Sequence, residues 1–331
     1  MRRSAPCTRQ RGAAILTAML TVVLIATLAS AMLWQQWRGI EIESAQRTRV
    51  QASWILVGAL DWARLILRED ARQGGADYLS EPWAVPLAPA RLSTFLAAEK
   101  GQALVSDDND AAQEAFLSGQ IEDLQARLNV TNLIQDQKID APGLAAWTRL
   151  FKHLNLPESE LQAMVQALLR AQSAGADSPS ESQSSANLPL QPLAVADLRW
   201  LGLSQRSLQT LQDFITLLPV RTPVNLNTAP PEVLLASVPG MDMAAAQALV
   251  LARASHHMNS LADADKLLDN PKIHLDASLQ GVASQFFMVT GQLRLGDVTL
   301  QEMSVLQREG MQVKTLSRTR QMLPSPDPTL Q

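Results

Sequence analysis

Cysteine and histidine are scarce in this chain of 331 residues. The single cysteine, Cys7, precedes a long apolar run, so no disulfide and no cysteine-based metal or thiol chemistry is available after that run. Among the four histidines, only His256 and His257 are neighbours. Adjacent residues point to different sides of a helix, and no third ligand stands at a useful spacing. We therefore interpret this pair as exposed cations at a helix end and not as a metal site.

Familiar catalytic motifs and an excess of positive charge are also missing. The sequence has no phosphate-binding loop and no Gly-x-Ser-x-Gly motif, and Asp61, Glu69 and Asp70 are expected to be ordinary surface carboxylates on a helix. The chain is thus predicted not to be an enzyme. Its net charge of −4 becomes −8 if residues 1–12, with four arginines and no acid, are removed. So acidic a chain is a poor general binder of nucleic acid.

What the chain does contain is one long apolar run. No charged residue occurs between Arg11 and Arg38. About 20 apolar residues suffice for a helix to cross the hydrocarbon core, so this run is long enough. The residues before it are basic, which predicts a cytoplasmic N-terminus and export of everything after Trp37. Trp34 and Trp37 at the far end suit the membrane interface.

Three interpretations of this run remain open on these residues alone. The first is a cleavable secretory signal, since Ala29-Ser30-Ala31 matches the cleavage pattern, although signal h-regions are typically about 7–15 residues long. The second is an uncleaved membrane anchor. The third is a prepilin-like leader, in which a short basic segment ends in Gly12. Cleavage before Ala13 would then leave the apolar helix in the mature protein.

The helical pattern continues beyond the apolar run. No proline occurs between Gln35 and Arg72, and Gly74-Gly75 follows as a terminator. We predict one helix from about Ala13 to Arg72, with its first half in lipid and its second half packed on a soluble domain. The residues expected to form the packing stripe recur at helical spacing; they are Trp54, Ile55, Trp62, Leu65 and Ile66.

The middle of the chain is predicted to be mainly helical. Residues 76–114 are irregular, with Trp83 as an anchor to a core, a short helix at 92–99 and a solvated acidic loop at 107–110. Residues 115–133 predict a β-hairpin. Capping and proline signals then predict a series of helices; they cover residues 142–154, 157–172, 194–201, 204–218, 230–236, 242–255 and 260–268. A serine-rich exposed loop is expected at 173–185.

The pattern changes to strands near the C-terminus. Residues 286–290, 293–295, 298–306 and 311–316 predict an antiparallel meander with tight turns at 296–297 and 309–310. The apolar face of the long helix could cover one face of this sheet. The predicted fold class is α+β, in which a long N-terminal helix packs on an antiparallel sheet and a large all-α domain is inserted. The polar tail from residue 319 is predicted to be disordered.

One segment is similar to a nucleic-acid-binding motif. Residues 224–242 resemble a helix-hairpin-helix, with an Asn-Thr-Ala cap, a short helix and a Pro-Gly turn. In DNA-binding examples a second glycine follows the turn, but here Asp242 occupies that position and would repel phosphate. Arg253 is the one basic residue on the following helix. A helical packing module is therefore favoured over a membrane-anchored periplasmic DNA-binding protein, which is the alternative function.

Four stretches in this order resemble one known family. They are Arg11–Thr17, Ile121–Val130 with Ala126 at a position that is usually glycine, Val224–Leu235, and the meander with Val305–Arg308. The family is minor pseudopilin K of type II secretion, or general secretion pathway protein K. The third stretch, with its Asn-x-Asn-Thr-Ala-Pro-x-Glu-Val-Leu pattern, is the most specific. Together the four cover most of the chain from Arg11 to Arg318.

The resemblance implies a pilin-like fold and a division of the chain. The parts are a prepilin-type leader (1–12), the transmembrane part of the helix (13–37), the periplasmic helix with the first part of the α+β domain (38–135), the inserted helical domain (136–278), the β-meander (279–318) and the tail (319–331). It also implies a non-enzymatic subunit at the tip of a periplasmic pseudopilus, anchored in the inner membrane, that nucleates assembly with minor pseudopilins I and J. Other implied partners are the remaining pseudopilins, the inner-membrane assembly platform, prepilin peptidase and membrane lipid, but not nucleic acid.

The resemblance also assigns roles near the N-terminus. Prepilin peptidase would cut between Gly12 and Ala13, and the new amine of Ala13 would be a candidate for methylation. Most pilin-like proteins have glutamate as the fifth residue after the cut, to neutralise the amine of the preceding subunit. Here that residue is Thr17, as is usual in the K family. A subunit that stands first needs no such glutamate, because it has no predecessor.

Calcium is not carried over from the resemblance. Many relatives have an acidic Asp-Trp-x-Asp stretch near residue 170, whereas Ala167–Gln172 contains no acidic residue here. We therefore expect no cofactor and no metal.

Overall fold

The computed structural model describes residues 11–92, 115–174, 189–295 and 298–323. The chain divides into two compact units, residues 1–55 and residues 56–331. The expectations for residues 92–99, for the acidic loop at 107–110, for the turn at 296–297 and for most of the loop at 173–185 lie outside the described residues.

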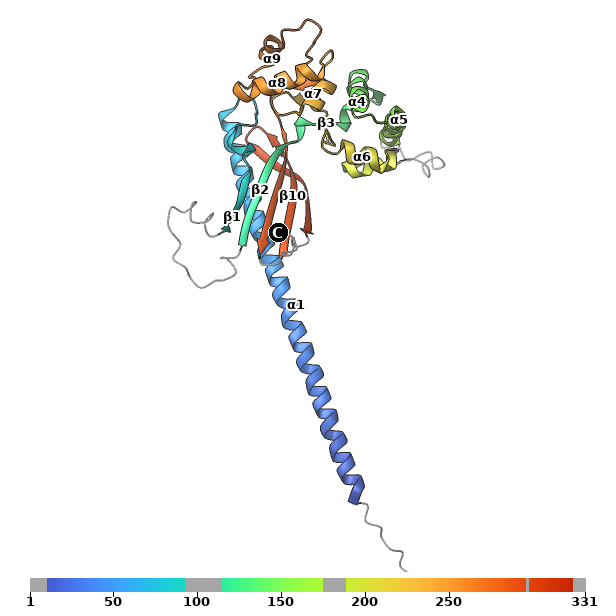
Figure 1. Cartoon of the computed structure of the whole chain (residues 1–331), viewed down its shortest axis with the longest axis vertical. Helices are drawn as coiled ribbons and strands as arrows, with labels where there is room; N and C mark the ends of the chain where they lie inside the picture. The colour runs from blue at the N-terminus through green and yellow to red at the C-terminus, as the bar shows by residue number, and fades with distance from the viewer. Residues whose placement is uncertain (1–10, 93–114, 175–188, 296–297, 324–331) are drawn as a thin grey trace, which may run out of the picture. The chain divides into compact units, whose positions relative to one another are not determined.

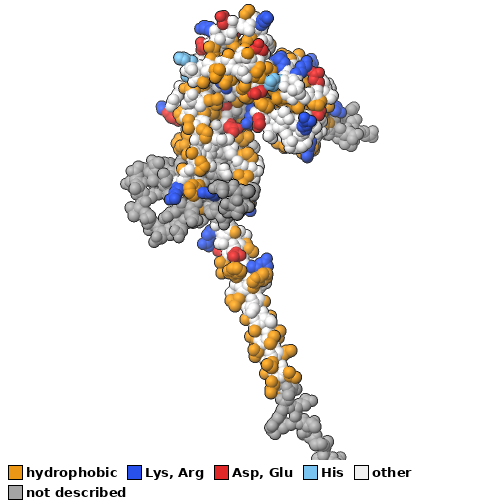
Figure 2. Space-filling view, in the orientation of Figure 1, with side chains coloured by type: hydrophobic (Ala, Val, Ile, Leu, Met, Phe, Trp, Pro, Cys, Tyr) orange, Lys and Arg blue, Asp and Glu red, His pale blue; other side chains and the backbone are white. Residues whose placement is uncertain are grey.

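Helix α1 runs from Arg11 to Gln73, so the predicted single helix is confirmed (Figure 1). Every side chain from Ala14 to Trp37 is exposed, and Figure 2 shows hydrophobic atoms along this part of the helix. The hydroxyl of Thr17 donates to the carbonyl of Ala14 at 3.0 Å, which satisfies the polar group within the helix. Within the part of the chain that the structure describes, α1 is the one helix long and apolar enough to span a membrane.

The second unit is built on a five-stranded sheet with the order β1-β2-β9-β10-β11, in which every pair is antiparallel. The strands are β1 (Leu87–Arg91), β2 (Ala115–Asp123), β9 (Phe286–Leu295), β10 (Val298–Glu309) and β11 (Gln312–Leu323). The predicted meander is confirmed, but its first two segments form the single strand β9. That strand continues through Gly291, where an added Cβ would lie 3.3 Å from Leu56 Cδ2, so glycine permits close approach of α1.

The face of α1 that packs on the sheet differs in part from the prediction. Leu60, Ala63 and Leu67 are the buried residues of α1 in one core cluster with the sheet, and Ile66 packs against them as predicted. Of the remaining expected stripe, Ile55 is half-buried and three residues are exposed, namely Trp54, Trp62 and Leu65. Both sets recur at helical spacing, so periodicity alone could not choose between them. Trp83 and Phe287 belong to the same core cluster, and an apolar pocket lined by Trp62 and Ala63 of α1 remains beside them against the sheet. The rings of Trp83 and Phe287 meet edge to face with centroids 5.2 Å apart, which confirms Trp83 as a core anchor.

A helical domain is inserted between β2 and β9, as predicted (Figure 1). Its helices are α4 (Ala141–His153), α5 (Glu158–Ala174), α6 (Gln205–Leu211), α7 (Pro231–Ser237), α8 (Met243–Ser255) and α9 (Leu261–Leu268). They enclose their own core, which includes Trp147, Phe151 and Leu234. Short strand pairs join the segments between them; these are β3 (Leu128–Asn129) with β6 (Ile215–Thr216), β4 (Ile134–Gln135) with β5 (Lys138–Ile139), and β7 (Val224–Asn225) with β8 (Gln280–Gly281).

Four local predictions are wrong. Part of the stretch expected to be irregular, residues 87–91, forms strand β1 and pairs with β2. The hairpin expected at 115–133 does not form, because β2 pairs with β1 and β9 and the chain then enters 3₁₀ turns capped by Asp123 and Asn129. The helix expected at 204–218 ends at Leu211, since residues 215–216 pair with β3. The tail predicted as disordered from 319 is strand up to Leu323, because it pairs with β10. In addition, the segment at 195–201 is a 3₁₀ helix and not an α-helix.

Candidate functional site

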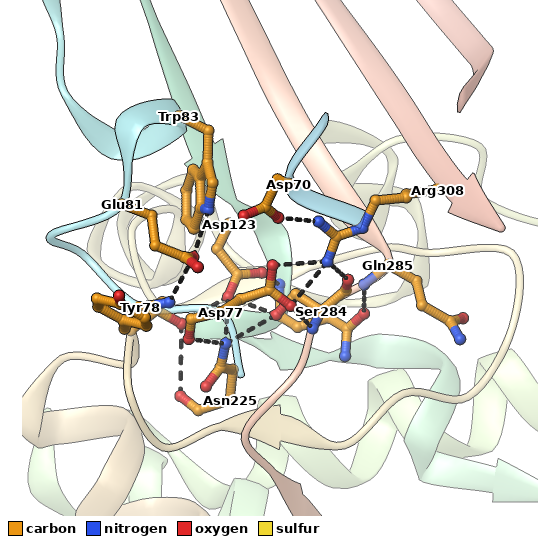
Figure 3. Close-up of polar contacts among 12 residues, drawn as sticks. Asp70, Asp77, Tyr78, Glu81, Trp83, Asp123, Asn225, Ser284, Gln285 and Arg308 are labelled. Carbon is orange, nitrogen blue, oxygen red and sulfur yellow. Dashed lines mark hydrogen bonds and ion pairs between the residues drawn. The ribbon is translucent and has the colours of Figure 1, made fainter. Parts of the chain in front are cut away.

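The most concentrated set of buried polar side chains lies where α1, the sheet and the insert meet (Figure 3). We call this set the polar junction; it consists of Asp70, Asp77, Asp123, Asn225, Thr228, Ser284 and Arg308. These residues come from the end of α1, the loop after it, the end of β2, residues 225–228 of the insert, the segment just before β9 and the end of β10. Segments far apart in the chain are therefore joined at one place.

Asp123 lies at the centre of the polar junction and is 5% exposed. Its Oδ1 accepts the backbone N–H of Gln125 at 2.7 Å. Its Oδ2 accepts three donors, from Asn225 Nδ2 at 3.0 Å, Thr228 Oγ1 at 2.6 Å and Ser284 Oγ at 2.6 Å. A carboxylate is the side chain that can accept at this many sites without donating, so the surroundings are matched to aspartate.

Asn225 connects the insert to the loop after α1 and to the segment just before β9. Its Nδ2 donates to the carbonyl of Asp77 at 3.1 Å and to Ser284 Oγ at 2.9 Å, besides Asp123. Its Oδ1 accepts the backbone N–H of Asn227 at 2.9 Å. The side chain of Asn227 in turn bonds both backbone groups of Met258, each at 2.9 Å. The two asparagines of the Asn-x-Asn-Thr-Ala pattern therefore have separate structural tasks, one outward to the sheet and one inward to the insert.

Arg308 supplies the positive charge of the polar junction. Its Nη2 donates to both carboxylate oxygens of Asp77, at 2.6 and 2.8 Å, and to the carbonyl of Ser284 at 2.8 Å. Its Nη1 pairs with Asp70, so the prediction that Asp70 is an ordinary surface carboxylate is wrong. Tertiary pairing across 238 residues of sequence is invisible in a helical pattern. The guanidinium also lies 4.8 Å from the ring centroid of Phe287, which adds a cation–π contact.

Amides beside the polar junction extend the connection into the insert. Gln125 accepts the N–H of Gln285 at 2.6 Å and donates to the carbonyl of Pro223 at 3.1 Å. Asn129 accepts the N–H of Leu218 at 3.1 Å and donates to the carbonyl of Val220 at 2.8 Å. These buried backbone groups would otherwise be unpaired, so the side chains fix the path of residues 218–223 against the end of β2.

The electrostatics of this region are dominated by burial. Burial raises the pKa of Asp77 to about 6, while Arg308 opposes that rise. Burial also raises the pKa of Glu81 to about 7, and the Tyr78 N–H and Trp83 Nε1–H that Glu81 accepts oppose it. The pKa of Asp123 is raised by burial against the pull of its donors. Carboxylates that lie this close together favour sharing protons as the pH falls.

Asp70, Asp77 and Glu81 place carboxylate oxygens within 4.8 Å of one another, a spacing that could hold a metal ion. In this structure Arg308 forms ion pairs with Asp70 and Asp77 and so balances their negative charge. Glu81 accepts hydrogen bonds from two N–H groups. The bonding pattern is that of a structural connection between segments. The Thr228 and Ser284 hydroxyls do donate to Asp123, but all three side chains are buried and serve to join segments of the chain.

The structure also explains the helix-hairpin-helix pattern. An added Cβ on Gly240, whose φ is +80°, would lie 2.1 Å from the carbonyl oxygen of Lys272, so glycine here permits close packing of the turn on the protein's own chain. Asp242 caps α8 by accepting the N–H of Ala245 at 2.8 Å. Arg253 turns inward and donates to the carbonyl of Leu226 at 2.6 Å. Each feature of the motif serves packing of the insert.

The predicted processing and assembly residues belong to the other unit. Gly12 and Ala13 lie in the first turn of α1, and Thr17 is exposed one turn later. The residues of the polar junction were missed by sequence reasoning as a site. Three of the four stretches that carried the family resemblance contribute to it, through Asp123, Asn225 and Arg308. The polar residues that stand among apolar neighbours in these three stretches were the sequence signal that could have indicated the polar junction.

Comparison with known proteins gives consistent results. The models for two domains described as type II secretion system (T2SS), protein K, match residues 126–220 and residues 224–282. The chain is 27% identical over 317 residues to type II secretion system protein K of Pseudomonas aeruginosa, covering 90% of this chain and 89% of the relative. It is 26% identical over 330 residues to the protein K of Klebsiella pneumoniae, covering 91% and 94%.

A solved structure shares the fold. In the crystal structure of the GspK-GspI-GspJ complex from the type 2 secretion system of enterotoxigenic Escherichia coli, one chain superposes with a TM-score of 0.62. The sequence identity is 17%, and the match covers 84% of this chain and 98% of that chain. The predicted α+β fold with an inserted helical domain is confirmed.

Replacing the central carboxylate should destabilise the second unit. In Asp123→Asn, either orientation of the amide points its NH₂ at donors, so we expect a loss of about 2–3 kcal/mol in the free energy of unfolding. Glu122→Gln on the same strand is the matched control, because Glu122 makes a partly exposed ion pair with Arg127 and should cost less than about 1 kcal/mol. Urea denaturation of both variants gives the comparison. Equal losses of stability in the two variants would show that the donors around residue 123 do not distinguish a carboxylate from an amide.

The raised pKa of Glu81 predicts a pH dependence of stability. A carboxyl whose pKa rises from 4.5 to about 7 on folding favours the protonated native state. Its contribution is therefore complete below pH 4.5 and is lost as the pH rises through 7. In Glu81→Gln we expect a flatter pH profile of the denaturation midpoint between pH 5 and 8. The difference should be on the order of 1 kcal/mol, because solvent screens this half-buried group. A parent profile as flat as that of the variant would contradict this assignment.

Proposed function

This chain belongs to the family of type II secretion system protein K, and we propose that it acts as a minor pseudopilin at the tip of the periplasmic pseudopilus. In this role it nucleates assembly of the filament that serves protein export across the outer membrane. Its task is structural and not enzymatic. The protein is anchored in the inner membrane by a single pass, with its N-terminus in the cytoplasm and the domain after the apolar run in the periplasm.

One observation carries this proposal beyond the family resemblance. Helix α1 is 63 residues long, and the residues at its two ends meet different requirements. Its N-terminal part is apolar and exposed, which suits lipid. Near its C-terminal end, Leu60, Ala63 and Leu67 belong to the core between α1 and the sheet. A helix that is both membrane segment and core element ties the periplasmic fold to the bilayer, as a pilin-like subunit requires.

The partners we propose are the minor pseudopilins I and J of the same system. The related solved structure is titled as a complex of GspK with GspI and GspJ, and the match extends over nearly the whole of the related chain. Further proposed partners are the other pseudopilins, the inner-membrane assembly platform and prepilin peptidase. The polar junction contributes by holding the insert in one orientation on the sheet, so that the subunit presents a single shape to its neighbours.

Co-purification tests the function directly. When the full chain is expressed with the I and J pseudopilins of its own system, we expect the three to be extracted from membranes as one complex. An unrelated single-pass periplasmic protein serves as the control bait. A chain that recovers neither partner, at matched expression, would contradict the proposed tip assembly.

Processing at the leader provides a second test. We predict a mature chain that begins at Ala13, to be read from the intact mass of membrane-extracted protein, with methylation adding to that mass. A peptidase that works beside the membrane must approach the scissile backbone closely, so a side chain at Gly12 obstructs it. Gly12→Leu should therefore accumulate uncut precursor, and Gly12→Ala should be processed better. Normal processing of the leucine variant, or a start at Met32, would count against a prepilin leader.

A substitution at Thr17 distinguishes a subunit at the tip of the filament from a subunit within its shaft. Thr17→Glu places a carboxylate near the cytoplasmic end of the apolar run, at a cost of about 1–3 kcal/mol that the remaining apolar residues can offset. A first subunit has no preceding amine to meet, so we expect normal insertion and no gain in pseudopilus formation or secretion. Matched protein levels are required for this measurement. Assembly above that of the parent would place the subunit inside the filament.

A further inference from the structure

The two edges of the five-stranded sheet are built differently. Strand β1 at one edge has five residues, contains Pro89, and changes register between Leu87 and Ala90. These are features that block further pairing. Strand β11 at the other edge has 12 residues with neither proline nor glycine. It pairs with β10 from end to end, with one extra residue at Leu316, and among the described residues no strand pairs with its outer side.

The outer side of β11 is accessible as well as unpaired. Most of its residues are exposed, including Leu316 at 43% and Met322 at 54%. An edge strand carries a row of backbone N–H and C=O groups that point away from the sheet, ready to pair with another strand. Proteins protect a long edge of this kind by shortening it, by proline, by a bulge, by charged side chains or by covering it. Strand β11 has the bulge at Leu316 and basic side chains, which disfavour pairing with a basic strand but not with an acidic one. Here only the opposite edge is both short and interrupted by proline.

The charge on β11 restricts what can pair with it. Its charged residues are Lys314, Arg318 and Arg320, all of them basic. Arg318 and Arg320 share the single carboxylate of Glu302, with an Arg318 Nε to Glu302 Oε1 distance of 3.2 Å, so one of the two positive charges stays unbalanced. Lys314 pairs with Glu309 at 2.8 Å, but both side chains are about half exposed and water screens that pair.

We propose that β11 is a docking edge that accepts an additional strand from another protein, an extended segment with acidic side chains. Backbone hydrogen bonds would supply the binding and the basic side chains the selectivity, as in other cases of strand addition. Pairing of β11 with β11 of a second copy of this chain is disfavoured, because the three basic residues of one strand would face the three of the other. The inference does not rest on the proposed place in a secretion filament.

Hydrogen exchange on the full chain in detergent micelles tests the proposal. The extra residue at Leu316 places Lys314 on the opposite face of the sheet from Arg318 and Arg320. The probe is therefore a synthetic ten-residue peptide of paired glutamates and paired valines in turn, which presents glutamate on both faces, and its control replaces every glutamate with lysine. We expect the acidic peptide to protect alternate backbone amides on each side of Leu316 within residues 312–323, because only every second N–H of an edge strand points outward. Equal protection by both peptides, protection without alternation, or no protection would each overturn the proposal. So would self-association of the chain through β11 without any peptide.

A charge reversal adds a matched pair of variants. Lys314→Glu should weaken binding of the acidic peptide several-fold and leave the fold intact, since Lys314 is exposed and its ion pair is with Glu309 and not with Glu302. Lys152→Glu on α4 makes the same charge change at an exposed ion pair away from the sheet. It should bind the peptide as the parent does. Equal weakening in both variants would show that net charge, and not the β11 edge, governs the interaction.

Discussion

The buried carboxylate of Asp123 is the constraint on which the second unit depends. A charge removed from water is tolerated only where donors converge on it, and its four donors come from the residues just after β2, from the insert and from the segment just before β9. In the observed arrangement all four donors are satisfied by this one carboxylate. The requirement therefore fixes how the insert emerges from the sheet and returns to it. Arg308 and Asp77 extend the same requirement to the end of α1.

The fit of α1 on the sheet follows from a second, apolar constraint. Trp83 and Phe287 take up much of the space under the helix, and Gly291 leaves room where Leu56 approaches. Leu60, Ala63 and Leu67 pack beside them, and Trp62 lines an apolar pocket that remains between the helix and the sheet. The helix end is then held by Arg308 through Asp70, so apolar packing and the polar junction position the same helix from two sides.

These constraints suit a subunit whose function is to present surfaces. A tip subunit must offer its neighbours one fixed shape, and a helical insert attached by two chain crossings alone would be free to tilt. The polar junction removes that freedom through directional bonds, whereas a purely apolar contact would permit sliding. The two sheet edges also differ, because β1 is short and contains proline, whereas no strand of the described ranges pairs with the outer side of β11.

The sequence by itself determined the long helix, the meander, the insert and the family. The apolar run, the change of period and the Asn-x-Asn-Thr-Ala-Pro pattern are all local signals. It also ruled out cysteine chemistry beyond the membrane segment. The packing face of α1, the end of β2 and the polar junction were decided only by tertiary structure. Two faces of α1 have helical spacing, and Asp70 differs from Asp61 only through Arg308, which is 238 residues away. Such pairings depend on which segments fold together, and no window of neighbouring residues contains that information.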